Sequence, residues 1–413
     1  MAFGIALSGI DAAQSNLNVT ANNVANSATT GFKSSAAQFS ELFAVSPQGT
    51  SNTQTGNGVK IAQVAQRFTQ GNITSTGNSL DMAISGDGMF AVSDHGALQY
   101  TRAGSFQTDV SGYVVNSSGQ RLQVFKPTTA GSFDTTSLSD LQLVTGDSAP
   151  QATSTAQMVF NLPANATPPT ASFSTADPTS YNQSTSVTLY DSLGAAHTAA
   201  MYFVNVSPNV WNAYEYIDAK PVNATPVKLT YGPSGVLAAS ADPAGGTNTS
   251  AVNFGTFTPT STGASPMNVG FDLSKSTQYG DTFGVNSVTQ NGYTTGKLSG
   301  ISVDSTGVVQ ANYTNGRSVA LGQVALANFS NQEGLQQVGN TNWTETYSSG
   351  SPIYGPAGGS GFGLVQAGAL EDSNVDITAQ LVQMITAQRS FQANAQMIST
   401  ENQITQSIIQ IRG

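Results

Sequence analysis

Apolar residues recur every seven positions at the start of this chain. The larger ones are Phe3, Ile10, Leu17 and Val24, and the smaller Ala6, Ala13 and Thr20 follow the first three of them by three positions. Alternating spacings of three and four residues place side chains along one stripe of a helix, as at the a and d positions of a coiled coil. The spacing therefore predicts a helix within residues 1–30 whose seam is short and rich in small residues.

A second apolar stripe closes the chain. Its members are Ile377, Leu381, Met384, Phe391, Ala395 and Ile398. We expect a helix within residues 375–413, with Ser373 or Asp376 as its N-cap. Only three of the residues from 377 to 413 are charged, whereas a solvated surface helix usually carries oppositely charged pairs. This favours a helix that other protein covers on most sides, although the two seams alone would also suit a helix pair within one molecule.

Between the two stripes, alternating or short apolar runs are broken by Gly, Asn and Asp, which is typical of β structure. The clearest runs are Leu80–Asp94, Gly112–Phe125, Ser186–Val206, Gly300–Tyr313 and Leu321–Phe329. Pro, Thr and Ala cluster in Leu162–Pro178 and in Ala219–Pro266, which we interpret as loops and domain boundaries. The predicted fold class is mixed α and mainly β. It is a discontinuous multidomain chain with paired N- and C-terminal coiled-coil helices and two nested β domains.

These elements predict four regions, three of which are built from two separate segments. Residues 1–30 and 375–413 form a terminal helical domain, and residues 31–70 and 344–374 form an extended linker region. Residues 71–143 and 286–343 form a middle β domain. Residues 144–285 form an inserted outer β domain.

Composition narrows the possible partners. The net charge is −10 and only 9% of the residues are charged, so no basic surface is expected for nucleic acid or an anionic membrane. The chain has no cysteine, which excludes disulfides and thiolate metal sites. No apolar run approaches the roughly 20 residues of a membrane span. The first residues lack the basic and unbroken apolar regions of an ordinary secretory signal.

Catalytic chemistry has little support in the sequence. The two histidines, His95 and His197, both lie in turn-like contexts without a second histidine at helical spacing, and we interpret both as solvated turn residues. Neither a nucleophile-elbow motif nor a phosphate-binding glycine loop occurs. Asn-x-Ser/Thr triplets are expected by chance in a chain so rich in these residues. The sequence therefore predicts no catalytic, cofactor or metal site.

Three blocks carry a family resemblance. The stretch ANNVANSATTGFK, residues 21–33, resembles the N-terminal signature of the bacterial flagellar rod and hook axial proteins. TGNSLDMAISGDGMFAV, residues 76–92, resembles the second shared block, and residues 368–400 resemble the C-terminal block. The linker motif in the first block comprises Asn22, Asn23, Asn26, Gly31 and Phe32. The blocks occur in the family's order, and together they are more specific than any one alone.

The extra segment from about residue 144 to 285 distinguishes the chain from the shorter rod members. Within it, Tyr190–Asn205 resembles the outer domain of the hook members. The resemblance implies a subunit of the hook, which self-assembles into a curved hollow helical tube outside the cell and acts as a universal joint between motor and filament. It implies a non-enzymatic protein without cofactors, with terminal helices in the inner tube and the C-terminal helix facing the channel.

The same resemblance implies partners. Besides copies of itself, these are the distal rod protein, the hook cap, the hook–filament junction protein, the hook-length ruler and the flagellar type III export apparatus. In related subunits a Phe-x-x-x-apolar element contacts the export gate, and Phe3 and Leu7 match its spacing. Packing on the helix seam explains Phe3 equally well. The alternatives are another axial protein, such as the distal rod or junction protein, or a secreted β-rich adhesin.

The linker also predicts how the free subunit behaves. The segment from Asn22 to about Ala65, with Gly361–Asp376 on the return, has too few apolar residues to form a core of its own. We therefore expect other subunits to bury it. We expect the ends of the free chain to be disordered and to fold on assembly.

Overall fold

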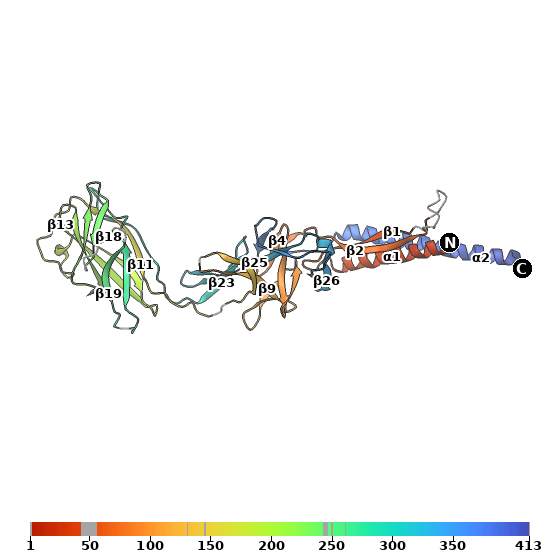
Figure 1. Cartoon of the computed structure of the whole chain (residues 1–413), viewed down its shortest axis with the longest axis horizontal. Helices are drawn as coiled ribbons and strands as arrows, with labels where there is room; N and C mark the ends of the chain where they lie inside the picture. Colours follow the sequence, from red (N-terminus) through yellow and green to blue (C-terminus); the bar gives the residue numbers. More distant parts are fainter. Residues whose placement is uncertain are drawn as a thin grey trace. The chain divides into compact units, whose positions relative to one another are not determined.

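A computed structural model describes residues 2–42, 56–129, 131–143, 146–242, 247–248, 251–260 and 262–412. The chain divides into two compact units, each of which is described by itself (Figure 1). The terminal unit comprises Met1–Thr145, Gly300–Asn312 and Ser318–Gly413. The inserted unit comprises Gly146–Ser299 and Tyr313–Arg317. The described residues are mostly β with a helix at each end, which confirms the predicted fold class at that level.

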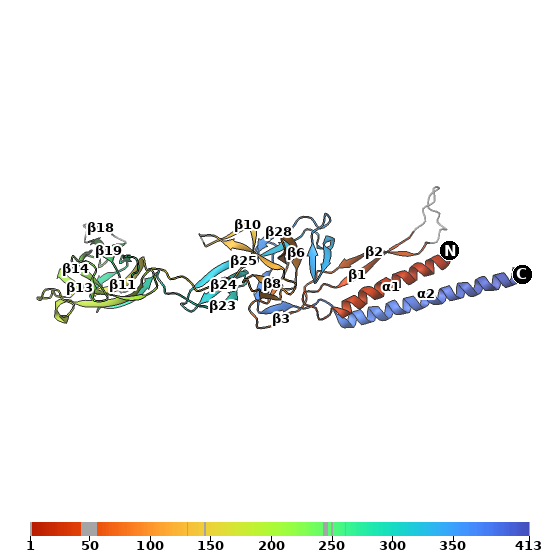
Figure 2. The same cartoon turned by 90° about the horizontal axis from the view of Figure 1, so that it is seen from below.

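The two terminal helices lie side by side. They are α1 (Ala2–Ala25) and α2 (Ile377–Arg412). Gly9 faces Asn394, and near the other end of α1 the Asn23 side chain donates to Gln380 Oε1 at 3.0 Å, so the helices run antiparallel. A Cβ at Gly9 would lie 2.7 Å from Asn394 Oδ1, so any larger residue there would have to displace the Asn394 side chain. Figure 2 shows α2 continuing beyond the N-terminus of α1.

Helix α2 begins at an acidic cap. The carboxylate of Asp376 accepts hydrogen bonds from the backbone N–H of Thr378 at 2.8 Å and of Ala379 at 3.2 Å. These N–H groups have no partner within the helix, so an N-cap oxygen stabilises them. The hydroxyl of Ser373 is buried without a hydrogen-bond partner among the described residues. Of the two predicted caps, the structure selects Asp376.

A β-hairpin lies along α1. Strands β1 (Ser35–Glu41) and β2 (Val59–Gln66) pair antiparallel, and the backbone N–H of Val59 donates to Ser8 Oγ at 3.2 Å. Residues 31–70, expected to be an extended linker, therefore include a paired hairpin that contacts the helix. The return segment 344–374 likewise contributes strands that pair within the terminal unit rather than standing apart from it.

The β part of the terminal unit is centred on one sheet of twelve strands. Its main path runs β23-β24-β25-β9-β5-β6-β27-β26, with β7, β8, β10 and β28 joined at its sides. In that path the strands are β23 (Leu298–Val303), β24 (Val308–Tyr313), β25 (Ser318–Asn328), β9 (Arg121–Pro127), β5 (Met89–Asp94), β6 (Ala97–Thr101), β27 (Asn342–Thr344) and β26 (Gln336–Gly339). The side strands are β7 (Phe106–Thr108), β8 (Val114–Asn116), β10 (Phe133–Asp140) and β28 (Ile353–Pro356).

Two further strand pairs join N- and C-terminal segments of the same unit. They are β4 (Met82–Ser85) with β29 (Leu364–Ala367), and β3 (Ile73–Ser75) with β30 (Ala369–Glu371). A short 3-10 helix, Gln332–Gly334, precedes β26. The core beneath these strands includes Met82, Phe90, Phe106, Leu122 and Leu326, all fully or almost fully buried.

The inserted unit contains two sheets that share one core. The seven-stranded sheet consists of β12 (Gln183–Tyr190), β13 (Ala196–Ser207), β14 (Val210–Ile217), β15 (Lys220–Pro221), β16 (Val227–Tyr231), β17 (Leu237–Ala241) and β18 (Thr247–Asn248). The five-stranded sheet consists of β11 (Thr155–Pro163), β19 (Val252–Phe257), β20 (Met267–Asp272), β21 (Thr277–Tyr279) and β22 (Gly284–Gln290). A 3-10 turn, Pro178–Ser180, precedes β12. Every second residue of β11 and β14 enters the core, which includes Phe160, Phe203, Trp211 and Phe271.

Two expectations for this unit need correction. The boundary expected at residue 285 falls inside β22, which pairs with β11 from Ala156↔Gln290 to Asn161↔Gly284, so the unit continues to Ser299. Ala219–Pro266, expected to be loop, contains β15 to β19. Its strands are short, and Thr, Ser and Ala obscure the alternation, but Val227, Leu229 and Tyr231 point inward at every second position.

Candidate assembly surface and its buried anchor

The terminal helices expose apolar side chains that no described part of the chain covers. On α2, Ile404, Ile408 and Ile409 are 52%, 57% and 66% exposed. Val382, Ile385 and Met397 on the same helix are exposed too, as are Phe39, Ile61 and Val64 on the hairpin. We name this helix and hairpin surface the assembly surface. So many exposed apolar residues in a nearly uncharged segment are typical of a surface that another protein covers.

The seam predicted on α1 is occupied mainly by its small members. Ala6, Ala13 and Thr20 are buried, whereas Ile10, Leu17 and Val24 are half-buried and Phe3 is 48% exposed. Small residues allow the two helix backbones to approach closely, so the larger side chains are left at the flanks. Leu7, the second export candidate, is also exposed, one turn from Phe3.

On α2 the residue that packs most closely was not among those predicted. Ala387 is buried, Met384, Ala395 and Ile398 are half-buried, and Ile377, Leu381 and Phe391 are exposed. A shallow groove of about 450 Å³ runs between the helices and is lined by Gln14, Leu17, Asn18, Gln388, Phe391 and Gln392. The predicted seam residues Leu17 and Phe391 therefore meet at a groove open to the outside.

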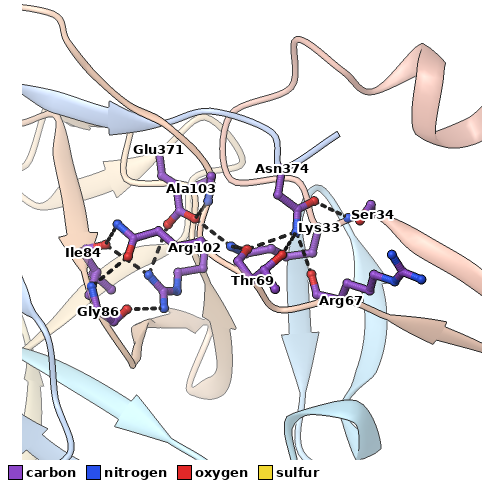
Figure 3. Close-up of polar contacts among 12 residues, drawn as sticks. Lys33, Ser34, Arg67, Thr69, Ile84, Gly86, Arg102, Ala103, Glu371 and Asn374 are labelled. Atoms are coloured by element: carbon purple, nitrogen blue, oxygen red, sulfur yellow. Dashed lines mark hydrogen bonds and ion pairs between the residues drawn. The ribbon is translucent and has the colours of Figure 1, made fainter. Parts of the chain in front are cut away.

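A buried ion cluster lies where the helices join the β strands (Figure 3). Glu371 is 0% exposed, and its Oε1 lies 2.6 Å from Nζ of Lys33. Its Oε2 lies 3.1 Å from Nη1 of Arg102. Oε1 also accepts the backbone N–H of Gly71 at 2.8 Å. One carboxylate thus connects the segment after α1, the segment after β6 and the end of β30.

The two cations have further acceptors of their own. Lys33 Nζ donates to the carbonyl of Thr69 at 2.8 Å, and Arg102 donates to the carbonyls of Ile84 at 3.2 Å and Gly86 at 2.6 Å. Burial lowers the pKa of Lys33 and of Arg102, and Glu371 acts against that shift in both. Without the carboxylate, two cations would stand buried and uncompensated, so Glu371 anchors the cluster.

Asparagines complete the anchor on the helix side. Asn374 Oδ1 accepts the backbone N–H of Ser34 at 2.7 Å, and its Nδ2 donates to the carbonyls of Arg67 at 2.8 Å and Thr69 at 3.0 Å. Asn23 pairs with the backbone of Ser35 in both directions, at 2.8 and 2.9 Å. These amides tie the start of the hairpin to both helices.

The remaining members of the linker motif have distinct places. Gly31 has φ +69°, and a Cβ there would lie 2.4 Å from the backbone nitrogen of Ala103. Phe32 is buried. Asn26 donates to the carbonyl and the side chain of Asn22 at 3.0 and 2.7 Å, which closes the end of α1.

These contacts correct one expectation. The linker motif was expected to be buried against other subunits, but Asn23, Phe32 and the adjacent Lys33 are buried within their own chain. Sequence reasoning also missed Lys33, Arg102 and Glu371. The available signal was the rarity of charge in this chain, since a lysine within a polar, otherwise uncharged motif has to be paired if it is buried. Its partner, 338 positions away, could not be identified from spacing.

The histidines also differ from expectation. His95 lies in a turn with φ +51° and an exposed ring, as predicted. His197 is instead 4% exposed and lies in β13 between the carboxylates of Asp191 and Asp218. Its place at an inward position of a strand, rather than in the preceding Gly-Ala-Ala turn, explains the difference.

Among the described residues there is no group of three or more potential metal-binding side chains with suitable geometry. No described helix is both long and apolar enough to cross a membrane.

Family profiles match most of the chain. They are the flagella basal body rod protein (residues 3–33), the flagellar hook protein FlgE/F/G D1 domain (83–170), the flagellar basal body protein FlaE D2 domain (161–293) and the flagellar basal body rod FlgEFG protein C-terminal region (366–411). The first and last of these profiles cover nearly all of the two helices and the residues next to them.

Full-length relatives are similar along the whole chain. The flagellar hook protein FlgE of Escherichia coli strain K12 is 39% identical over 424 residues, covering 100% of both chains. That of Borreliella burgdorferi is 31% identical over 450 residues, covering 98% of each. The crystal structure of Helicobacter pylori flagellar hook protein FlgE2 has a TM-score of 0.53 at 14% identity and covers 72% of this chain and 100% of its own, which indicates a shared fold.

Proposed function

This chain belongs to the family of bacterial flagellar hook proteins and is a structural subunit of the hook, and on that premise we propose that its assembly surface builds the wall of a curved, hollow helical tube. In this proposal the tube is the flexible universal joint that transmits motor torque to the filament. The terminal helices pair as a short coiled coil and form the inner tube. The β strands of the terminal unit form a middle domain, and the inserted unit forms an outer domain.

The exposed apolar residues of α2 carry the proposal. By the antiparallel alignment of Gly9 with Asn394, the start of α1 lies opposite about residue 401, and no other described helix of the chain lies beside the rest of α2. Ile404, Ile408 and Ile409 belong to that part and stay more than half exposed. Burying the exposed part of each such side chain stabilises by about 1–2 kcal/mol, since full burial of a fully exposed one contributes about 1.5–3 kcal/mol. In a heterologous, repeating contact this gain drives growth of a helical polymer.

Bending follows from the nature of the outer surfaces. One side of a curved tube must shorten while the other lengthens, so contacts between axial neighbours have to change. Surfaces of Ser, Thr, Asn and Gln exchange hydrogen bonds at modest cost, often through water. We expect the β domains of neighbours to slide while the helices keep the tube continuous. Cross-linking the inserted units of axial neighbours should then lock the tube, and unchanged bending stiffness would contradict sliding.

The remaining parts of the proposal concern export and location. The subunit leaves the cell through the flagellar type III export apparatus, with Phe3 and Leu7 at the export gate. Outside, it joins the distal rod protein below, the hook cap during growth and the hook–filament junction protein above, and its polymer length is set by the hook-length ruler. The exposure of both Phe3 and Leu7 supports access by a partner.

Negative-stain microscopy of purified protein under polymerising conditions tests the proposal. The full chain is compared with a chain lacking residues 1–30 and 375–413, which loses Asn23 but keeps Lys33, Arg102, Glu371 and Asn374 and hence the buried ion cluster. Curved tubes from the full chain alone are expected. Tubes from the shortened chain would refute the role given to the helices. NMR of the free subunit tests whether its ends are disordered, and protected amides at both ends would contradict that expectation.

A further inference from the structure

A buried histidine connects three segments of the inserted unit. Nδ1 of His197 lies 2.6 Å from Asp218 Oδ2, and Nε2 lies 3.3 Å from Asp191 Oδ2. Both neighbours are carboxylate acceptors, whereas a neutral imidazole has only one N–H to donate. The geometry therefore fits an imidazolium that donates from both ring nitrogens.

Each carboxylate also holds its own turn. Asp191 Oδ1 accepts the backbone N–H groups of Leu193 at 2.9 Å and Ala195 at 2.8 Å, and Oδ2 accepts the hydroxyl of Thr262 at 2.8 Å. Asp218 Oδ1 accepts the backbone N–H of Thr198 at 3.1 Å. Asp218 stands at φ +49°, in the tight turn that joins β14 to β15. The imidazolium thus links the turn after β12, the turn after β14 and the segment around Thr262.

The surroundings contain few other charges. The charge of Lys220 on β15 helps to lower the pKa of Asp218. The ring of Phe257 on β19 packs edge-on against the imidazole, with the two ring centroids 5.7 Å apart. Glu215 faces the same interior from β14, but it lies opposite Met201, two inward positions further along β13. The charge of His197 is therefore balanced by Asp191 and Asp218.

We propose that Asp191, His197 and Asp218 form a protonation-dependent lock in the inserted unit. The charged ring holds all three segments, and loss of its proton releases the Asp191 turn together with the Thr262 segment. The remaining proton stays on Nδ1, where the contact with Asp218 is shorter by 0.7 Å (3.3 − 2.6). The lone pair of Nε2 then faces the carboxylate of Asp191, which is repulsive.

The direction of the pH dependence follows from the contacts. Burial lowers the pKa of His197, but the hydrogen bonds and charges of Asp218 and Asp191 outweigh it and raise the pKa above its ordinary value. The same contacts help to lower the pKa of both carboxyls. A raised histidine pKa adds stability that is complete below the unfolded value of about 6.5 and is lost as pH rises through the folded value. The lock is therefore closed in mild acid and opens in alkali.

Residue-resolved hydrogen exchange by NMR on the full chain tests the lock. Protection factors, corrected for the intrinsic pH dependence of exchange, are followed for the amides of Leu193 and Ala195 between pH 5.5 and 9.5. The ring signals of His197 are titrated in the same samples, and His95→Gln leaves a single histidine signal. We expect protection of the two amides to fall at least about tenfold as His197 loses its proton, because a hydrogen bond to a charged group is lost.

His197→Gln is the matched variant, with His95→Gln as its control. In His197→Gln the same amides should be weakly protected at every pH, and the step should vanish, whereas His95→Gln should behave as the wild type. Constant protection through the titration of His197 in the wild type would overturn the proposal. An unchanged step in His197→Gln would also overturn it, and the wild-type measurement decides alone if that variant does not fold.

Discussion

Lys33 and Glu371 are 338 positions apart in the chain, yet their side chains meet at 2.6 Å in the interior of the terminal unit. Arg102 reaches the second oxygen of the same carboxylate. We predict that Glu371→Gln destabilises this unit by about 3–5 kcal/mol, because it leaves two buried cations without compensation. Urea unfolding of a Trp211→Phe chain measures the effect, since Trp343 is then the only tryptophan and is buried in the terminal unit.

The surface pair of Arg121 and Asp140 provides the control for that measurement. Arg121 Nη1 lies 2.9 Å from Asp140 Oδ2, and both side chains remain partly exposed. Asp140→Asn should change stability far less than Glu371→Gln. Equal losses in the two variants would mean that burial of the Glu371 cluster has no special weight.

Gly31 should be intolerant of even one added carbon. Its φ of +69° is unfavourable for alanine, and the new Cβ would meet the backbone nitrogen of Ala103 at 2.4 Å. Gly119 has φ +79° but open space around its Cβ position. Gly119→Ala should therefore cost about 1–2 kcal/mol from the backbone alone, and Gly31→Ala clearly more, in the same urea assay. Similar values for both would exclude the proposed contact.

The stability of the inserted unit should fall with rising pH because of Glu215, which is opposite to the effect of a surface acid whose pKa is lowered by folding. Burial raises its pKa to about 8, and its Oε1 has no hydrogen-bond partner among the described residues. A raised carboxyl pKa means that the folded state binds more protons, so stability falls as pH rises from about 4.3 towards 8. Glu215→Gln removes this loss. Its stability relative to the wild type should rise by about 1.4 kcal/mol per pH unit in that window.

Trp211 fluorescence in a Trp343→Phe chain reports the unfolding of the inserted unit. The interval between pH 5 and 6 reports mainly on Glu215, because His197 stays largely protonated in both the folded and the unfolded state there. A stability difference between Glu215→Gln and wild type that stays constant over this interval would contradict the assigned pKa.

Assembly should depend on the far end of α2. We predict that Ile404→Gln combined with Ile408→Gln leaves the thermal unfolding of the subunit unchanged but raises the protein concentration needed for polymerisation. Each change removes a side chain that is exposed in the subunit and that we propose is buried in the polymer. Val110→Gln with Tyr347→Gln, at fully exposed positions in the β part of the terminal unit, is the control. Sedimentation of polymer over a concentration series measures the shift, and equal behaviour of the two double variants would contradict the assembly surface.

Export and packing make different predictions for Phe3. If Phe3 and Leu7 contact an export gate, Phe3→Ala and Leu7→Ala should each reduce secretion in a strain whose only copy is the variant. Leu17→Ala, which alters a half-buried seam residue, should not. Immunoblots of culture medium against cell contents measure this. Normal secretion of Phe3→Ala would leave only the packing role.

The two helices could be predicted because their signal is local. Seven-residue spacing defines α1, and the Asp376 cap and missing charges define α2. The packing within the pair was harder to predict, since Ala387 and Asn23 are buried while Phe3 and Leu381 are exposed. Large apolar side chains gain the most free energy on burial, so a sequence pattern favours them as core residues. Two helices that approach closely instead bury small residues at their contact.

Long-range pairing explains the rest of what the sequence did not reveal. Val227 and Leu229 alternate with polar residues, as in a strand that is buried on one face. In a segment rich in Thr, Ser and Pro, however, that pattern is a weak signal. The environment of His197 depends on Asp218, which is supplied by another strand turn 21 positions away. Glu371 could be recognised as charged from the sequence, but only the fold brings it to Lys33 and Arg102.

The contact between Asn23 and Gln380 spans 357 positions. Because the helix pair needs both ends of the chain, it cannot form on an incomplete polypeptide, whichever end emerges first. Contacts of such high sequence separation are also expected to form late in folding, after the local strands. The pairing of α1 with α2 therefore requires both ends of the same subunit, and a chain broken anywhere before α2 would lack α2 and with it the helical part of the proposed assembly surface.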